Sequence, residues 1–147
     1  MARPWRLAGA TVAAVVAADQ ALKQLVVSSF EPGESENVFF GIDLTYVRNE
    51  GVAFGLGSGG WPIIAITLGA LIMLTLYFEL HSDRPALWLP AGAIMGGALG
   101  NLADRARDGS VIDYVDPKFW PAFNLADVAI VIGILGLLYV IEEPGKR

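Results

Sequence analysis

Acidic and carboxamide side chains gather in one stretch of the sequence, Gly100 to Asp127, which lies between two apolar runs. Five of the chain's fifteen acidic residues fall in it: Asp104, Asp108, Asp113, Asp116 and Asp127. Charged groups near a hydrocarbon core are costly and usually functional, so this concentration needs a chemical reason. Two aspartates close together in a partly dry site cannot both ionise easily, and such a pair can activate a water molecule for peptide hydrolysis.

Asp113 and Asp127 are the two acids that we expect to form this pair. Asp113 follows Val111-Ile112 in a predicted returning loop, and Asp127 falls in the first turn of a predicted helix. The segment between them is long enough to bring the carboxylates face to face. Spacing alone leaves a second interpretation open, because an acid at a helix start also complements the helix dipole.

Other catalytic arrangements find little support. His81 is the only histidine and lies in a predicted turn at the opposite end from the acids, which disfavours a Ser-His-Asp arrangement. The sequence has no HExxH motif, no paired histidines and no cysteine, so we expect no metal and no cofactor. The net charge of −5 makes nucleic acid an improbable partner.

The elements that must position these acids are apolar. The chain is 54% hydrophobic, with a mean hydropathy of +0.53. We predict one domain, residues 1–147, of the α-helical membrane class. Its four transmembrane helices are expected at residues 7–27, 61–78, 87–104 and 124–141, on the length that a span requires. The first could instead be a cleavable signal peptide, because Arg3 and Arg6 precede a short apolar run; its length favours a retained span.

A small β element is expected between the first two helices. Residues 38–40 and 42–47 are β-branched and aromatic and are separated by Gly41, which predicts two short strands. We expect this β-rich loop, about residues 36–57, to rest on the membrane surface. The glycines between Gly51 and Gly60 suggest a segment that closes over a substrate.

Helix geometry predicts that three polar residues meet. At about 1.5 Å per residue, Asp19, Asn101 and Asp127 each lie roughly 18–21 Å from the inner end of their helices. We therefore expect one shared polar site below the outer surface. Both termini are placed inside, although the count of basic residues, five against four, barely decides the orientation.

Three further patterns have structural interpretations. Asp19 and Lys23 stand four residues apart on one helical face and are expected to pair, and Asp104 with Arg105 could form a second ion pair. Gly92, Gly96 and Gly100 form a small-residue stripe that lets another helix pack closely. Trp61, Tyr77 and Phe78 fit an interfacial aromatic belt.

Five motifs together resemble those of the lipoprotein signal peptidases (signal peptidase II). In order, they are Asp19-Gln20 with Lys23, Asn49-x-Gly51-x-x-Phe54, Gly100-Asn101-Leu102-Ala103-Asp104-Arg105, Val111-Ile112-Asp113-Tyr114, and Phe123-Asn124-Leu125-Ala126-Asp127. The resemblance covers nearly the whole chain, including the expected four-span layout, and no motif position departs from the pattern.

The resemblance implies a bacterial inner-membrane aspartyl endopeptidase that removes the signal peptide from prolipoproteins, cutting before a cysteine that carries diacylglycerol. Asp113 and Asp127 would be the catalytic pair. The residues implied to shape the pocket, hold substrate or support the site are Asn49, Gly51, Asn101, Asp104, Arg105, Asn124, Ala126, Asp19 and Lys23. The β-rich loop and active site would face the extracytoplasmic side, with membrane lipid around a monomer.

Two rival functions remain at this stage. Acids within membrane spans also form proton relays, so a small proton-coupled transporter or channel subunit is one rival. It predicts acids spread across the membrane depth. A non-enzymatic scaffold held together by the glycine stripe is the other rival, and it would tolerate Asp113→Asn.

Overall fold

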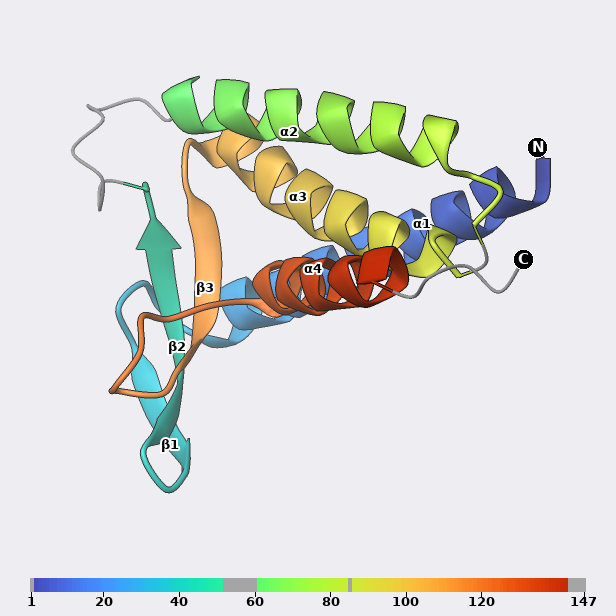
Figure 1. Cartoon of the computed structure of the whole chain (residues 1–147). Helices are drawn as coiled ribbons and strands as arrows, with labels where there is room; N and C mark the ends of the chain where they lie inside the picture. The colour runs from blue at the N-terminus through green and yellow to red at the C-terminus, as the bar shows by residue number, and fades with distance from the viewer. Residues whose placement is uncertain (1, 52–60, 85, 143–147) are drawn as a thin grey trace.

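The structure is a computed structural model that describes residues 2–51, 61–84 and 86–142. Its elements are α1 (Ala2–Ser29), β1 (Ser35–Phe39), β2 (Ile42–Asn49), α2 (Trp61–Leu80), α3 (Trp88–Asp108), β3 (Val111–Asp116) and α4 (Leu125–Glu142). The sheet lies at one end of the helices, and the start of α1 and the end of α4 lie at the other (Figure 1). The predicted helices are therefore present, with α1 and α3 extending further than expected.

Within the described residues, three helices are long and apolar enough to cross a membrane, at Arg3–Ser29, Trp61–Leu80 and Leu125–Glu142. The fourth helix, α3, has 21 residues and hence the length of a span. It is less apolar because it carries Asn101, Asp104 and two arginines. The described part of the chain thus has four helices, of which three are candidate spans by length and composition.

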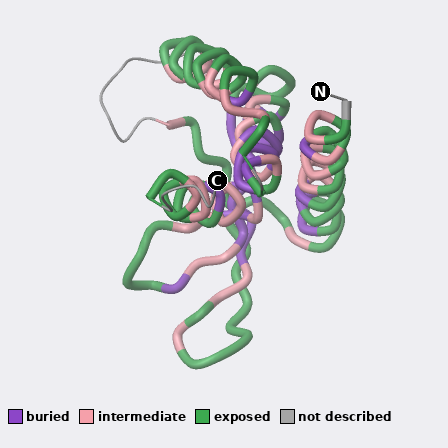
Figure 2. The backbone as a smooth tube through the Cα atoms, turned by 45° about the vertical axis from the view of Figure 1, so that its right-hand side comes forward, coloured by how far each residue is buried: buried purple, intermediate pink, exposed green. Residues whose placement is uncertain are grey.

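Helix α3 is the centre of the bundle. It packs against α1, α2 and α4, and buried residues gather along it and along β3 (Figure 2). Because its neighbours are protein, its polar side chains can hydrogen-bond where a lipid-facing helix would leave them unpaired. Its position explains why a helix with a lower hydropathy sits between three apolar ones.

The glycine stripe of α3 brings α1 close, as predicted. A Cβ built on Gly96 would lie 2.8 Å from Val15 Cβ of α1, and one on Gly92 would lie 2.8 Å from Thr11 Cβ. A Cβ on Gly100 would lie 2.6 Å from Asp19 Oδ2. The absence of side chains here therefore sets the helix separation and also admits a carboxylate.

The expectation that Phe78 belongs to an interfacial aromatic belt is wrong. The Phe78 side chain is fully buried and packs edge-to-face on Trp5, with ring centroids 4.7 Å apart. Leu87 and Ala91 complete the same buried cluster. Phe78 therefore joins α1, α2 and α3, whereas Trp61 is exposed, as an interfacial residue would be.

The sheet has three antiparallel strands in the order β1-β2-β3, where the sequence predicted only two strands. Residues 111–116, expected as a loop, form β3 because they pair with β2, far away in the sequence. The register sets Val47 opposite Asp113 and Asn49 opposite Val111. Since alternate residues of a strand share a face, Asn49 lies on the same face as Asp113. Residues 52–60, including Phe54 and the expected closing segment, lie outside the described residues.

Candidate active site

Asn124 and Asp127 fix the start of α4 through two reciprocal hydrogen bonds. The Asp127 backbone N–H donates to Asn124 Oδ1 at 3.0 Å, and the Asn124 backbone N–H donates to Asp127 Oδ2 at 3.2 Å. This is the geometry of a capping box, with Asn124 at the N-cap and Asp127 three residues later. The predicted place of Asp127 in the first turn of the helix is therefore confirmed.

Two other elements satisfy the remaining amides of this turn. The Leu125 N–H donates to the Tyr114 hydroxyl at 3.0 Å, and the Ala126 N–H donates to Asp19 Oδ1 at 3.1 Å. Free amides at a helix start are costly when buried, and here β3 and α1 supply their acceptors. The position of Asp127 is consequently tied to α1, β3 and its own cap.

The Asn124 side chain joins this helix start to Asp113. It is fully buried, and its Nδ2 donates to Asp113 Oδ1 at 2.9 Å and to Asn101 Oδ1 at 3.0 Å. A third acceptor, the Ile112 carbonyl, lies at 3.2 Å. Because Oδ1 of Asn124 accepts from the Asp127 amide, its Nδ2 must face Asp113. One side chain therefore links the Asp113 carboxylate to the backbone of Asp127.

Asp113 is held from the other side by Asn49. Asn49 Nδ2 donates to Asp113 Oδ2 at 3.0 Å, and Asn49 Oδ1 accepts the Gly51 N–H at 2.9 Å. Gly51 has φ +73°, a left-handed conformation that glycine adopts without strain. The turn after β2 thus orients Asn49 toward the acid, which gives the predicted residue Gly51 a structural reason.

Burial dominates the electrostatics of Asp113. The residue is 3% exposed, and burial raises its pKa from 3.8 to about 6, with the hydrogen bond from Asn49 opposing and the charge of Asp127 adding to the rise. Asp113 therefore keeps its proton to a higher pH than an exposed aspartate does.

Asn101 connects Asp127 to a buried ion-pair cluster. Its Nδ2 donates to Asp127 Oδ1 at 2.8 Å, and its Oδ1 accepts from Lys23 Nζ at 3.0 Å. Lys23 Nζ also lies 2.8 Å from Asp19 Oδ2 and 2.7 Å from Asp104 Oδ2. The expectation that Asp19, Asn101 and Asp127 share one polar site is confirmed, and so is the pairing of Asp19 with Lys23.

The second expected ion pair, between Asp104 and Arg105, is not formed. The partners of Asp104 are Lys23, Gln20 and Arg107, at 2.7, 2.9 and 3.1 Å, and not Arg105. Asp104 is fully buried, so pairing with a buried lysine offsets the cost of removing both charges from water. This carboxylate therefore belongs to the packing of α1 on α3.

Arg105 lies beside the acids, and one nitrogen of its side chain is buried without a hydrogen bond. Among the described residues its Nε has no partner, and the charges that act on its guanidinium are those of Asp113, Asp127 and Asp104. An unmet buried donor is costly. Arg105 therefore places an unpaired donor and a positive charge beside the two acids.

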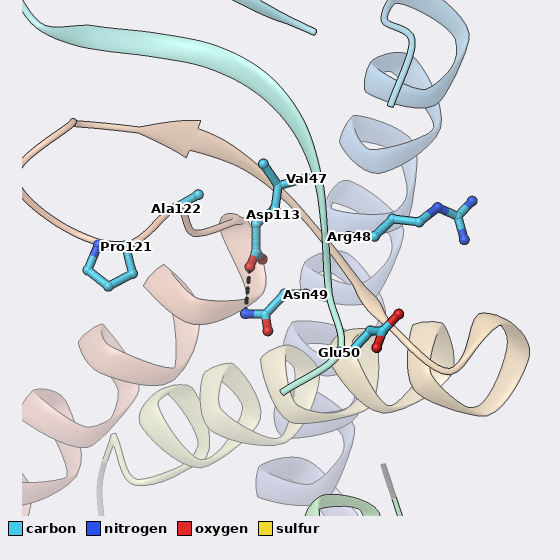
Figure 3. A pocket seen from close by; sticks show the side chains of 7 residues that line it. All are labelled: Val47, Arg48, Asn49, Glu50, Asp113, Pro121 and Ala122. Carbon is cyan, nitrogen blue, oxygen red and sulfur yellow. Dashed lines mark hydrogen bonds between the residues drawn. The ribbon is translucent and has the colours of Figure 1, made fainter. Parts of the chain in front are cut away.

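A pocket opens on the Asp113 side of the sheet (Figure 3). It has a volume of about 420 Å³. Its lining residues are Val47, Arg48, Asn49, Glu50, Asp113, Pro121 and Ala122. In the close-up, Asp113 and Asn49 point toward one another through their hydrogen bond, with Pro121 and Ala122 on the other side. A polypeptide segment in this pocket would meet Asp113 directly.

The structure brings all the predicted site residues to this end of the bundle. Sequence reasoning missed two contributors, Tyr114 and Gln20. Tyr114 directly follows Asp113 and Gln20 directly follows Asp19 in the motifs of the family, so both could have been included among the site residues. His81 stacks on Tyr77 at the end of α2 and lies away from the acids, as expected. The described residues contain no cluster of side chains that could hold a metal ion.

Comparisons with known proteins agree with this geometry. The family model described as signal peptidase (SPase) II matches residues 11–142. The lipoprotein signal peptidase of Moorella thermoacetica is 45% identical over 135 residues, covering 88% of this chain and 89% of that protein. That of Syntrophomonas wolfei is 44% identical over 135 residues, covering 90% and 91%.

A solved structure described as a bacterial membrane enzyme, determined by the in meso method at 1.9 Å resolution, superposes with a TM-score of 0.81. It is 28% identical and covers 94% of both chains. The apolar helices and this likeness identify a multi-pass membrane protein. Because the family model spans most of the sequence and the relatives exceed 40% identity, the chain belongs to the signal peptidase II family.

Proposed function

We propose that the protein is an aspartyl endopeptidase that removes signal peptides from diacylglyceryl-modified prolipoproteins, with Asp113 and Asp127 as its catalytic pair. The observation that carries the proposal is the bridge formed by the Asn124 side chain, which donates from Nδ2 to the Asp113 carboxylate and accepts the backbone N–H of Asp127 at Oδ1. Membership of the family, whose relatives are lipoprotein signal peptidases, supports the substrate class.

The chemistry needs only these two carboxyl groups and water. The ionised carboxylate takes a proton from a water molecule while the oxygen of that water attacks the scissile carbonyl carbon. The protonated partner donates its proton to the carbonyl oxygen, which gives a neutral tetrahedral intermediate. The first carboxyl group then gives its proton to the leaving nitrogen, and one hydroxyl group of the intermediate returns a proton to the second carboxylate. The carbon–nitrogen bond breaks, a carboxylic acid and an amine are released, and the pair regains its starting protonation state. The raised pKa of Asp113, about 6, favours it as the proton donor.

The neighbouring side chains would hold the acids and the substrate. Asn49 and Asn124 fix Asp113, and Asn101 fixes Asp127, so little reorganisation is needed when substrate arrives. Arg105 would contact a substrate carbonyl with its unpaired donor. Ala126, whose amide meets Asp19, and the Asp19–Lys23 pair would keep the start of α4 in place.

We infer that all four helices span the cytoplasmic membrane, with both termini inside and the sheet outside. The start of α1 and the end of α4 lie at the end opposite to the sheet, as this orientation requires (Figure 1). The first helix would be retained, because it supplies Asp19 and Lys23 to the site. A cysteine anchored by diacylglycerol would then hold the scissile bond at the depth of the acids, with one enzyme monomer acting on each substrate.

The rivals fit less well. A proton path needs acids along the membrane depth, but Asp19, Asp104, Asp113 and Asp127 all belong to the network at the sheet end of the helices. A scaffold has no need of an aspartate whose pKa is raised by burial.

Cleavage of a defined substrate tests the proposal. Purified enzyme in detergent is given a diacylglyceryl-modified prolipoprotein and, as a control, the same protein with serine in place of the lipidated cysteine. We expect a cut immediately before the lipidated cysteine and none in the control. A verified substrate that stays intact would exclude the proposed activity, and equal cleavage of both would exclude the lipid requirement.

A further inference from the structure

The outer end of the sheet carries large apolar side chains that nothing in the described structure covers. Val38, Phe39 and Phe40 stand at the end of the β1–β2 hairpin with exposures of 66%, 64% and 93%. Phe119 and Trp120, in the loop after β3, are 86% and 66% exposed. We call these five residues the aromatic tip.

The two parts of the aromatic tip form one unit. Lys118 Nζ lies 3.3 Å from Asp43 Oδ2, which joins the loop to β2. Asp43 in turn accepts from Asn37 Nδ2 at 2.7 Å and from the Ser35 hydroxyl at 3.3 Å, both on β1. The hairpin and the loop are therefore held together by polar contacts behind the apolar side chains.

This hairpin is apolar at its turn and acidic near its base, whereas a water-exposed hairpin normally has a polar turn. Hairpin turns in water are normally polar, because turns project from the protein. Here the turn at Gly41, with φ +80°, is flanked by phenylalanine and isoleucine, while Glu31, Glu34 and Glu36 stand near the base. Phe39 and Phe40 pack edge-to-face at 5.1 Å, but this contact covers little of Phe40. The end of the hairpin is thus built for an apolar surrounding.

The position of the hairpin indicates which surrounding that is. Its strands run crosswise to the helices and project beyond α4 (Figure 1). If the helices stand along the membrane normal, as proposed above, the hairpin extends along the membrane surface and past the bundle. The surface beneath the aromatic tip is then lipid, continuous with the lipid-facing side of α4, where Val131, Leu135 and Leu138 are exposed.

We propose that the aromatic tip inserts into the headgroup–acyl boundary of the outer leaflet and anchors the sheet there. Aromatic side chains concentrate at this boundary of the bilayer. A second copy of the chain is the less suitable occupant, because the free edge of β1 is short and carries Glu36. The anchor keeps β2 and β3, and with them Asn49 and Asp113, at a constant depth relative to a lipid-bound substrate.

The absence of cysteine makes a direct test possible. Phe40→Cys and Phe119→Cys are labelled separately with a nitroxide, and Glu36→Cys, exposed on the same hairpin, is the matched control. The proteins are placed in nanodiscs of phosphatidylethanolamine and phosphatidylglycerol. We expect the first two labels to be severalfold more accessible to oxygen, and less to a water-soluble nickel complex, than the control label.

Two outcomes would overturn the proposal. One is a label at Phe40→Cys as accessible to the nickel complex as the label at Glu36→Cys. The other is spin–spin broadening that disappears on dilution with unlabelled protein, which would identify a second copy as the occupant. The inference rests on the proposed membrane orientation, but the label depth is read without any substrate. Failure of the anchor is therefore distinguishable from failure of the proposed activity.

A functional measurement complements the depth measurement. The variant Phe40→Ser/Phe119→Ser/Trp120→Ser changes no residue of the pocket lining. In nanodiscs we expect its KM for lipidated substrate to rise severalfold with little change in kcat. An unchanged KM would contradict the role of the anchor in presenting the site to the substrate.

Discussion

Asn124 and Asp127 cap one another at the start of α4, each donating its backbone N–H to the side chain of the other, at 3.2 and 3.0 Å. This relationship has a consequence for chemistry as well as for folding. It uses Oδ1 of Asn124 and therefore directs the Nδ2 group toward Asp113. The cap of one helix thus sets the relative position of two carboxylates that belong to different elements.

Asn124→Ser separates these two functions. Serine can cap the helix, but it cannot donate to Asp113 as the amide does. We expect at least a tenfold loss of kcat/KM, with about 1 kcal/mol more stability than Asn124→Ala, which also loses the cap. Thermal unfolding in detergent and cleavage of lipidated substrate measure the two effects. A serine variant with full activity would show that the bond to Asp113 has no role.

The pKa of Asp113 predicts a pH-dependent stability. Its value of about 6 exceeds the ordinary 3.8, so the folded state binds this proton more tightly than the unfolded state does. The resulting stabilisation is complete below pH 3.8 and is lost as the pH rises through about 6. Asp113→Asn cannot titrate. We therefore expect its Tm, relative to wild type, to increase by a few degrees between about pH 4.5 and pH 7.5.

Asp43→Asn is the matched control for that measurement. Asp43 is on the same sheet, and the hydrogen bond from Asn37 is the main cause that lowers its pKa. Its contribution to stability is present above 3.8 and falls only when the pH drops through its lowered pKa. Its Tm difference from wild type should stay flat over the same range. A flat difference for Asp113→Asn as well would contradict the raised pKa.

Lys23→Met should strongly destabilise the protein. It leaves Asp19 and Asp104 buried without their shared cation, a change that typically costs about 3–5 kcal/mol. Arg107→Gln is the control, because Arg107 pairs with the same Asp104 from an exposed position and should cost about 1 kcal/mol or less. Denaturation in mixed detergent micelles compares them. Equal losses would show that burial does not set the strength of this cluster.

Gly96→Ala tests the close packing of α3 on α1. The new methyl group would lie 2.8 Å from Val15 Cβ, so we expect a loss of about 1–3 kcal/mol. Gly69→Ala, on α2, meets nothing within 4 Å and should be neutral or slightly stabilising, since alanine favours helix. Unfolding of the two variants under identical conditions gives the comparison. A neutral Gly96→Ala would mean that the helices can separate without cost.

The helices could be predicted from the sequence, and so could the shared polar site of Asp19, Asn101 and Asp127. The rise per residue of a helix gives each side chain a position along the helix axis, and these three positions agree. The sequence did not suffice for β3. The segment Val111–Asp116 becomes a strand only through pairing with β2, a long-range contact that local patterns do not contain. The same limit applies to Asp104, whose partner Lys23 comes from another helix, whereas sequence proximity suggested Arg105.

The sequence also did not predict that Asn124 both caps α4 and hydrogen-bonds Asp113. The Asn-x-x-Asp spacing indicates a helix start, and that part could be predicted. The direction of the remaining amide group depends on where β3 brings Asp113, which is a property of the assembled fold. Phe78 shows the converse, since an aromatic residue at a helix end fits an interface by composition but is buried by the packing of three helices.

The decisive measurement is cleavage of a diacylglyceryl-modified prolipoprotein by Asp113→Asn and Asp127→Asn. Asp108→Asn, an exposed acid at the end of α3, is the matched control, and unfolding curves confirm that each variant is folded. We expect both pair variants to lose at least a thousandfold in kcat/KM while the control cuts at the wild-type rate. Near-normal turnover by either folded variant would contradict the two-aspartate mechanism.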